Sequence, residues 1–441
     1  MLVGSVVIYY RDLVLLSQSL GYYSCGCDNP MSKNCTFLLA SWWLFGPFVF
    51  PAGCSQPDNA PRVTILDRTS ADPSPVPNST GGSASTSSGG GTAIDTGGAE
   101  PNSNAPITGL SNRTWNWVPF EDAHCRSGSS TGIGINPNPA SDKLLILLEG
   151  GGACFDAATC GLTISLYGSD LFSKFTVDDQ YGGGAGVFNR NDPENPVSEW
   201  NFVYVPYCTG DVHAGNNPQG VIDTLKPQQF VGYVNMGLYL KRIVPTFSGI
   251  SQVLLTGVSA GGFGALANYV QVAKEFDPIP VSLLDDSGPP MDGPVLPACL
   301  AQIFYETWNL DKTVQPDCGV DCAEPTHLLI DFLKHVSKTY PDVPFGLIES
   351  TADWVISIFF GFGQNDCSGF FQLPEATFTA GLQDIRAQMT GQNNFGAYLF
   401  PGLEHTTLLD STTFDTRVAA NLKLTAFIAQ LLNGQVTNVG P

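Results

Sequence analysis

The sequence predicts an α/β fold, with a doubly wound, mostly parallel sheet and helices on both faces. From residue 143 onward, short apolar runs end in Gly, Pro or polar residues, and such runs are typical of strands buried on both faces. Segments with helical spacing of apolar residues alternate with them, as in a doubly wound sheet. One apolar run leads through the small-residue turn "GVSAGG" into a helix.

These runs and segments can be assigned in order along the chain, and they indicate one folded domain without internal repeats. We expect strands at residues 143–149, 201–207, 252–258, 279–287, 344–350 and 395–402. We expect helices at residues 230–246, 261–276, 327–338, 376–390 and 416–433.

The N-terminal region carries an export signal. Residues 36–50, "TFLLASWWLFGPFVF", have the length of a signal-peptide core and are too few to span a bilayer comfortably. The following "PAGC" resembles a bacterial lipobox that ends in Cys54. We therefore expect a lipoprotein-like signal peptide over residues 31–53, lipidation at Cys54, and an over-extended gene start over residues 1–30. An ordinary secretory signal with a coincidental cysteine is the alternative.

A flexible tether is expected over residues 54–109, before a catalytic domain over residues 110–441. The tether region is rich in Ser, Gly, Pro, Asn and Asp, and residues 55–107 contain no Phe, Trp or Tyr. Such a segment cannot bury enough apolar surface to offset the entropy lost on ordering.

Charge and cysteine content restrict the function. The chain has 40 acidic and 19 basic residues and a net charge of −21, which argues against nucleic acid or an anionic membrane surface as partner. Its 12 cysteines indicate an oxidising compartment and disulfides. The cysteines after Cys54 are even in number, but parity does not fix their pairing. A zinc site at Cys318-x3-Cys322 is the alternative to disulfides, but the cysteines after Cys54 include no second close pair that could complete such a site.

Two segments fit the nucleophile pattern Gly-x-Ser-x-Gly, and their surroundings separate them. Ser259 follows the apolar run 252–258 and precedes a helix, with small residues around it. A nucleophile elbow requires this context because its serine takes a strained backbone conformation. Ser130 lies in the polar stretch "SGSSTGIG", with no strand before it. We therefore predict that Ser259 is the nucleophile.

The base should lie downstream of Ser259, because the triad of a hydrolase with this elbow runs Ser, acid, His along the chain. His405 follows the run 395–402 by a short loop, where a catalytic histidine belongs. The other histidines lie upstream of the elbow or in a helical segment: His124, His213, His327 and His335. We predict that His405 is the base.

The acid should follow a strand between these two residues. Asp353 comes a short turn after "PFGLIES", and its carboxylate would orient the imidazole. Its rivals fit less well: Asp366 lies in the loop "GFGQNDCSG", Asp384 lies on a predicted helix, and Glu349 lies inside its strand.

An oxyanion hole is indicated by "LLILLEGGGACFD", where a glycine run directly follows a strand. Glycine lets backbone N–H groups approach a substrate closely, as in the HGGG motif of lipases. Glu149 stands in the histidine's position of that motif. We predict donors at Gly151, Gly152, Ala153 and Ala260. A phosphate-binding loop is the alternative, but G-x-G-x-x-G and the P-loop lysine are missing.

Four ordered segments, "LEGGGACFDAATC", "VPYCTGDVHAG", "TGVSAGGFGA" and "STADWV", resemble the pectin acetylesterase/Notum family of α/β-hydrolases over about residues 110–435. The resemblance implies the same triad and the same oxyanion hole. It also implies disulfides Cys154–Cys160 and Cys125–Cys208, with the remaining four cysteines paired among themselves. Ala153 departs from the family, which usually has an aromatic residue at the pocket mouth.

We expect an exported, monomeric serine carboxylic-ester hydrolase that needs no metal or cofactor. An O-deacetylase of polysaccharide or small esters is the first expectation, because the lipoprotein-like start indicates a bacterial member of the family. The acidity of the chain weakens pectin as the substrate. The alternatives are a long-chain acyl, lipid or polyester esterase on the same fold, and a non-catalytic surface binding protein.

Overall fold

The structure is a computed structural model that describes residues 104–441. The signal peptide, the cysteine proposed for lipidation and nearly all of the predicted tether lie outside the described residues. Packing begins slightly before the predicted boundary at residue 110, because Ile107 is 5% exposed and its backbone N–H donates to Thr246 Oγ1 at 2.7 Å. Within residues 104–441, no helix is long and apolar enough to cross a membrane.

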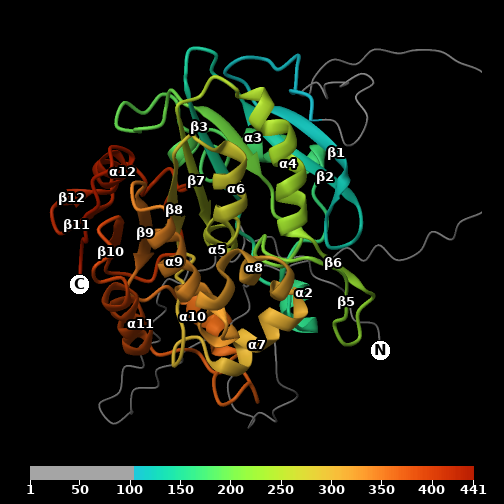
Figure 1. The fold of residues 1–441 in the computed structure, drawn as a ribbon, viewed down its shortest axis with the longest axis vertical. Coiled ribbons are helices and arrows are strands. Elements are labelled where there is room, and N and C mark those ends of the chain that lie inside the picture. The colour runs from blue at the N-terminus through green and yellow to red at the C-terminus, as the bar shows by residue number, and fades with distance from the viewer. Residues whose placement is uncertain (1–103) are drawn as a thin grey trace, which may run out of the picture. The chain divides into compact units, whose positions relative to one another are not determined.

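A large sheet forms the centre of this region, and its strands run in the order β1-β2-β4-β3-β7-β8-β9-β10 (Figure 1). The strands from β4 to β10 pair in parallel, and β1 and β2 pair antiparallel at one edge. The α/β fold class predicted from the sequence is confirmed. The strands are β1 (Asn116–His124), β2 (Ser130–Asn136), β3 (Lys143–Leu148), β4 (Asn201–Val205), β7 (Gln252–Val258), β8 (Val281–Asp286), β9 (Phe345–Ser350) and β10 (Phe395–Phe400).

Helices cover both faces of the sheet, and the alternation of side chains along each strand divides the core in two. On one face, Ile146 and Leu255 pack in a cluster with residues of α4, α6, α9 and α11; on the other, Leu147 and Leu254 pack with α3 and α12. The helices are α2 (Ala157–Leu162), α3 (Ser169–Thr176), α4 (Gly232–Thr246), α5 (Ala260–Ala267), α6 (Tyr269–Phe276), α7 (Ala298–Thr307), α8 (Val314–Cys318), α9 (Leu328–Thr339), α10 (Trp354–Gly361), α11 (Glu375–Gln388) and α12 (Leu424–Leu432).

Two predicted helices differ from the structure. The helix expected at residues 261–276 is two helices, α5 and α6, because the Asn268 side chain donates to Gly264 O at 2.7 Å and to His213 O at 2.9 Å. The helix expected at residues 416–433 begins only at Leu424, after the small hairpin of β11 (Val418–Ala419) and β12 (Leu422–Lys423). A second small hairpin consists of β5 (Asn217–Gly220) and β6 (Gln228–Phe230).

Candidate active site

Ser259 occupies a strained turn between β7 and α5. Its φ of +58° and ψ of −122° are unfavourable for a residue with a side chain. The turn closes only because its neighbours are small: a Cβ added to Gly257 would lie 2.0 Å from Gly261 O, and one added to Gly261 would lie 2.0 Å from Leu148 O. The local sequence therefore forms the geometry of a nucleophile elbow, with Ser259 4% exposed.

Asp353 and His405 form a buried pair. Asp353 Oδ2 lies 2.6 Å from His405 Nδ1, and the two side chains are 0% and 3% exposed. The other carboxylate oxygen of Asp353 accepts from the backbone N–H groups of Val355 and Ile356 at the start of α10, at 2.8 and 2.9 Å. Because both of its oxygens are engaged, the carboxylate is fixed in the orientation that holds the imidazole.

A single residue at the end of β8 joins the elbow to the histidine loop. The backbone oxygen of Asp286 accepts from Ser259 N–H at 2.7 Å. Its side-chain Oδ2 accepts from Thr407 N–H at 2.8 Å and from Leu408 N–H at 2.7 Å, just after His405. The predicted nucleophile and base therefore attach to one residue, which sequence reasoning did not single out.

The glycine loop after β3 lies against the elbow. A Cβ on Gly150 would lie 2.8 Å from Ser259 Cβ. Within the described part of the chain, the backbone N–H groups of Gly152, Ala153 and Ala260 donate to no protein acceptor. Such groups are available to an oxyanion.

Tyr207, another residue that the sequence reasoning did not assign, supports this loop. Its hydroxyl donates to Gly152 O at 2.9 Å, and its backbone N–H donates to Glu149 Oε2 at 2.8 Å. Glu149 itself is partly buried, and its pKa is raised to about 7, chiefly by desolvation of its carboxyl group. The acid in the position of the lipase-motif histidine thus lies beneath the loop and shapes it.

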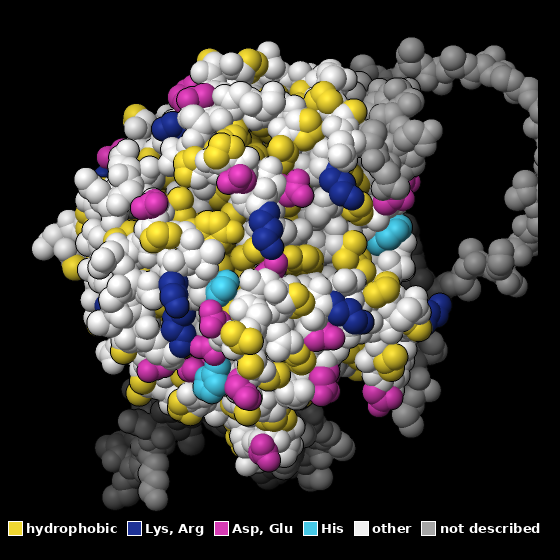
Figure 2. Space-filling model, in the orientation of Figure 1, with side chains coloured by type: hydrophobic (Ala, Val, Ile, Leu, Met, Phe, Trp, Pro, Cys, Tyr) yellow, Lys and Arg dark blue, Asp and Glu magenta, His cyan; other side chains and the backbone are white. Residues whose placement is uncertain are grey.

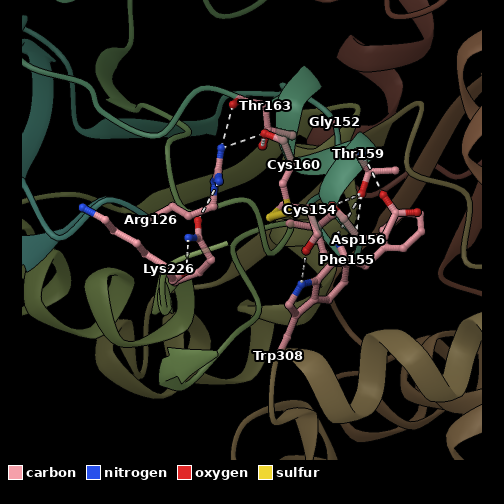
Figure 3. Close-up of a disulfide and its surroundings, with 12 residues drawn as sticks. Arg126, Gly152, Cys154, Phe155, Asp156, Thr159, Cys160, Thr163, Lys226 and Trp308 are labelled. Atoms are coloured by element: carbon pink, nitrogen blue, oxygen red, sulfur yellow. Dashed lines mark hydrogen bonds between the residues drawn. A yellow bond between two sulfur atoms is a disulfide. The ribbon is translucent and has the colours of Figure 1, made fainter. Parts of the chain in front are cut away.

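The loop is anchored further by a disulfide between Cys154 and Cys160 (Figure 3). Trp308 Nε1–H donates to Cys154 O at 3.0 Å, and the Arg126 guanidinium donates to the carbonyl oxygens of Cys160 and Thr163 at 2.9 and 2.8 Å. Figure 3 shows Arg126 and Trp308 reaching this segment from different directions. The position of the predicted oxyanion loop therefore depends on residues far away in the sequence.

The described part of the chain contains three further disulfides. Cys125–Cys208 is the second pair that the family resemblance implied, and Cys299–Cys367 and Cys318–Cys322 join the other four cysteines. Because Cys318 and Cys322 are bonded to each other, neither sulfur is a thiolate ligand for zinc.

An apolar pocket of about 70 Å³ opens beside Ser259. Gly152, Ala153 and Ala260 line it together with Ser259, so the predicted oxyanion donors and nucleophile share one cavity. His405 is not part of the lining. The remaining lining is almost entirely apolar and includes Phe263, Met291, Leu296, Ala301, Phe304, Trp308, Leu310, Val314, Leu328, Leu329, Ile356, Phe359 and Phe360.

The residues that we rejected as nucleophile, acid or base occupy other positions in the fold. Ser130 begins the antiparallel strand β2, Asp384 lies on α11, and Asp366 lies in a turn after α10. Glu349 is the rejected acid that comes close to the site, since it lies in β9 beside Asp353. The remaining histidines lie in other parts of the fold. His124 ends β1, and a ring nitrogen of His213 lies within hydrogen-bond distance of Glu149 O. His327 pairs with Asp292, and His335 pairs with Asp321.

The profile of one protein family, Pectinacetylesterase, matches residues 103–357, more than half of the chain. The chain belongs to the pectinacetylesterase family. This membership confirms the resemblance drawn from the four motifs and places the chain in a family of carboxylic-ester hydrolases.

Curated relatives and a solved structure agree with the family. The palmitoleoyl-protein carboxylesterase notum2 of Xenopus laevis is 34% identical over 154 residues, which are 34% of this chain and 30% of that protein. The palmitoleoyl-protein carboxylesterase NOTUM of Mus musculus is 31% identical over 246 residues, which are 54% of this chain and 44% of that protein. The chain thus spans less than half the length of these two relatives.

The Wnt deacylase Notum of Drosophila superimposes with a TM-score of 0.53 at 18% identity, over 74% of this chain and 96% of that structure. At this level of identity the likeness shows a shared fold. It agrees with the large, mostly parallel sheet of this pectinacetylesterase-family chain.

Proposed function

We propose that this chain is a serine carboxylesterase with Ser259 as nucleophile, His405 as base and Asp353 as acid. The observation that carries the proposal is the cavity that Ser259 shares with the available N–H groups of Gly152, Ala153 and Ala260. The buried Asp353–His405 pair supports it, because the histidine loop is hydrogen-bonded to the same residue as the elbow.

The reaction proceeds through an acyl-enzyme. Ser259 Oγ attacks the ester carbonyl while its proton passes to Nε2 of His405, and Asp353 stabilises the imidazolium through Nδ1. The N–H groups of the glycine loop and of Ala260 stabilise the oxyanion. Collapse expels the alcohol, which takes the proton from His405. Water then gives a proton to His405 and attacks the acyl-enzyme. As the acid leaves, Ser259 Oγ takes that proton from His405, and the free enzyme is restored. This scheme requires no metal or cofactor.

The apolar pocket favours an ester with an apolar acyl chain longer than acetyl. An acetyl group is too small to use a lining that extends from Ala153 to Leu328 and Phe360. The Notum relatives are named for removing a palmitoleoyl group, which agrees with such a pocket. Deacetylation of a carbohydrate or small ester remains the alternative substrate class, and a binding protein without catalysis is the alternative function.

We propose that the enzyme acts outside the cytoplasm. The disulfides support export, because such bonds persist in oxidising compartments. Attachment through a lipid on Cys54 and a monomeric state are parts of the same proposal. On the face shown in Figure 2, Lys and Arg side chains are scattered among Asp and Glu and form no basic patch.

Hydrolysis of p-nitrophenyl acetate, butyrate, octanoate and palmitate by the full chain tests the proposal, with Ser259→Ala as the matched variant. We expect kcat/KM to rise from acetate to a longer acyl chain and to fall at least ~10³-fold in the variant.

Each outcome has a distinct meaning. Activity restricted to acetate would support the deacetylase alternative and refute the proposed use of the apolar pocket. Equal rates for the two proteins on every ester, together with no labelling of Ser259 by a fluorophosphonate, would favour the binding-protein alternative.

A further inference from the structure

The turn at the end of β8, formed by Asp286 and Ser287, lies between the strands that carry the nucleophile and the acid. β8 is paired with β7 on one side and β9 on the other (Figure 1). Both residues are buried, with exposures of 0% and 1%, and neither has a part in the reaction steps above. Ser287 has a φ of +63°, a conformation that needs support from its surroundings.

This turn holds the elbow. The N–H of Ser259 donates to Asp286 O at 2.7 Å. The N–H of Ser287 donates to Ile348 O in β9 at 3.0 Å, which connects the same turn to the strand leading to Asp353. The strained φ of Ser259 is therefore stabilised from β8.

The turn also holds the loop that follows His405. Three successive backbone N–H groups point to it: that of Thr406 donates to Ser287 Oγ at 3.1 Å, and those of Thr407 and Leu408 donate to Asp286 Oδ2 at 2.8 and 2.7 Å. The Ser287 hydroxyl donates to Asp286 Oδ1 at 3.1 Å.

The charge of Asp286 also reaches the site. Burial raises the pKa of its carboxyl, while the N–H groups of Leu408 and Thr407 and the nearby His405 lower it. Two buried acids therefore act on His405: Asp353 bonds to its Nδ1, and Asp286 interacts with it electrostatically.

We propose that Asp286 and Ser287 are positioning residues that set the separation of Ser259 Oγ and the His405 imidazole. This inference rests on the proposed function, because it concerns the proton transfer between those two groups. A displacement of about 1 Å between reacting groups can cost ~10²-fold in rate. A turn bonded to both segments is the part of the fold that controls this distance.

Three variants test the role: Asp286→Asn, Asp286→Ala and Ser287→Ala. Asparagine keeps an oxygen for the N–H groups of Thr407 and Leu408, so kcat should fall only ~10-fold. Alanine at position 286 leaves both N–H groups unpaired, so kcat should fall ~10²-fold or more. KM should stay within about threefold in all three variants, because the turn does not line the pocket.

The matched control is Asn394→Ala. Asn394 is also buried, and its side chain donates to the carbonyl oxygens of Ser337, Tyr340 and Val343 at 3.0 Å each. It directly precedes β10, whereas His405 follows the other end of that strand. This variant should lose stability in urea unfolding and keep the wild-type kcat.

A readout independent of turnover is the proton NMR resonance of His405 Nδ1–H, assigned with His405→Ala. The 2.6 Å contact with Asp353 should place this resonance far downfield. It should shift or broaden in Asp286→Ala and Ser287→Ala and stay unchanged in Asn394→Ala.

The two readouts separate the two proposals. The positioning role would be overturned if the variants at Asp286 and Ser287 lost stability, as Asn394→Ala should, but kept the wild-type kcat and an unchanged His405 resonance. If the wild type hydrolyses no ester, the proposed function fails, and the resonance alone then decides whether the turn positions His405. If Asp286→Ala does not fold, Asp286→Asn and Ser287→Ala carry the test.

Discussion

Glu149 is a partly buried residue that directly precedes the glycine loop, and its carboxyl group accepts from the backbone N–H of Tyr207. Burial raises its pKa to about 7, although Tyr204 and the backbone of Tyr207 donate hydrogen bonds that lower it. The folded protein therefore keeps this proton at pH values where the unfolded chain, with a pKa near 4.5, has lost it. The stability that the protonated form contributes is present below pH 4.5 and is lost as the pH rises through about 7.

Replacing Glu149 by Gln should remove this pH dependence. The variant keeps an oxygen for Tyr207 N–H but cannot ionise, so its stability relative to the wild type should increase from pH 4.5 to 7 by up to roughly 3 kcal/mol and then level off. Urea unfolding at a series of pH values, with the disulfides intact, measures the difference. Parallel stability curves for the two proteins would contradict the assignment.

Glu349 is a buried acid within β9 that lies close to Asp353. Burial raises its pKa well above the usual value, and the nearby Asp353 and Asp286 raise it further. Glu349 and Asp353 therefore share one buried region, in which Asp353 is bonded to His405. Sequence position alone excluded Glu349 as the acid, and the structure adds that it borders the pair.

The helices between β8 and β9 form the element that shapes the apolar pocket beside Ser259. Ala301 and Phe304 of α7, Val314 of α8 and Leu328 of α9 all line it. Trp308, at the end of α7, lines the same pocket and donates to Cys154 O. The pocket wall and the proposed oxyanion loop are thus in direct contact.

Ala301→Trp should narrow the pocket from α7. Because Ala301 is 5% exposed and lines the cavity, the indole should exclude long acyl chains and leave room for acetyl. We expect kcat/KM for the octanoate ester to fall at least ~10-fold and that for acetate to change less than about threefold. Ala376→Trp, on the exposed start of α11, is the control. Equal losses on both esters would indicate a general packing defect.

At the scale of the folded region, residues 104–441, the disulfides differ widely in the length of chain that they enclose. Cys125–Cys208 closes a loop with a sequence separation of 83, and Cys318–Cys322 closes one of 4. If a disulfide stabilises the protein by lowering the conformational entropy of the unfolded chain, Cys125–Cys208 should stabilise it far more than Cys318–Cys322 does.

Removing the two bonds separately should therefore give unequal losses. The double variant Cys125→Ala/Cys208→Ala should lose about 4 kcal/mol of unfolding free energy, and Cys318→Ala/Cys322→Ala about 2 kcal/mol. Urea denaturation of the two variants beside the wild type gives both values. A larger loss from the short loop would show that local packing, and not loop closure, dominates.

Much of the sheet could be predicted because its central strands are continuous apolar runs, which are typical of strands buried on both faces. The runs at residues 143–149 and 252–258 coincide with β3 and β7, whose side chains face helices on both sides. β1 and β2 were missed because they lie at the antiparallel edge, where polar residues and Pro119 interrupt the apolar pattern. The first part of the helix expected at residues 416–433 failed because Ala420 and Asn421 take positive φ in a tight hairpin.

By itself the sequence determined the turn of the predicted nucleophile, because glycines stand at the positions around Ser259 where a Cβ would clash with the backbone. It also placed Asp353 and His405 after strands, and parallel strands bring such residues to one edge of a sheet. Only the tertiary structure decided what surrounds them. The Asp286 turn, the support from Tyr207 and Glu149, and the apolar pocket all depend on contacts between distant segments, which no local pattern encodes.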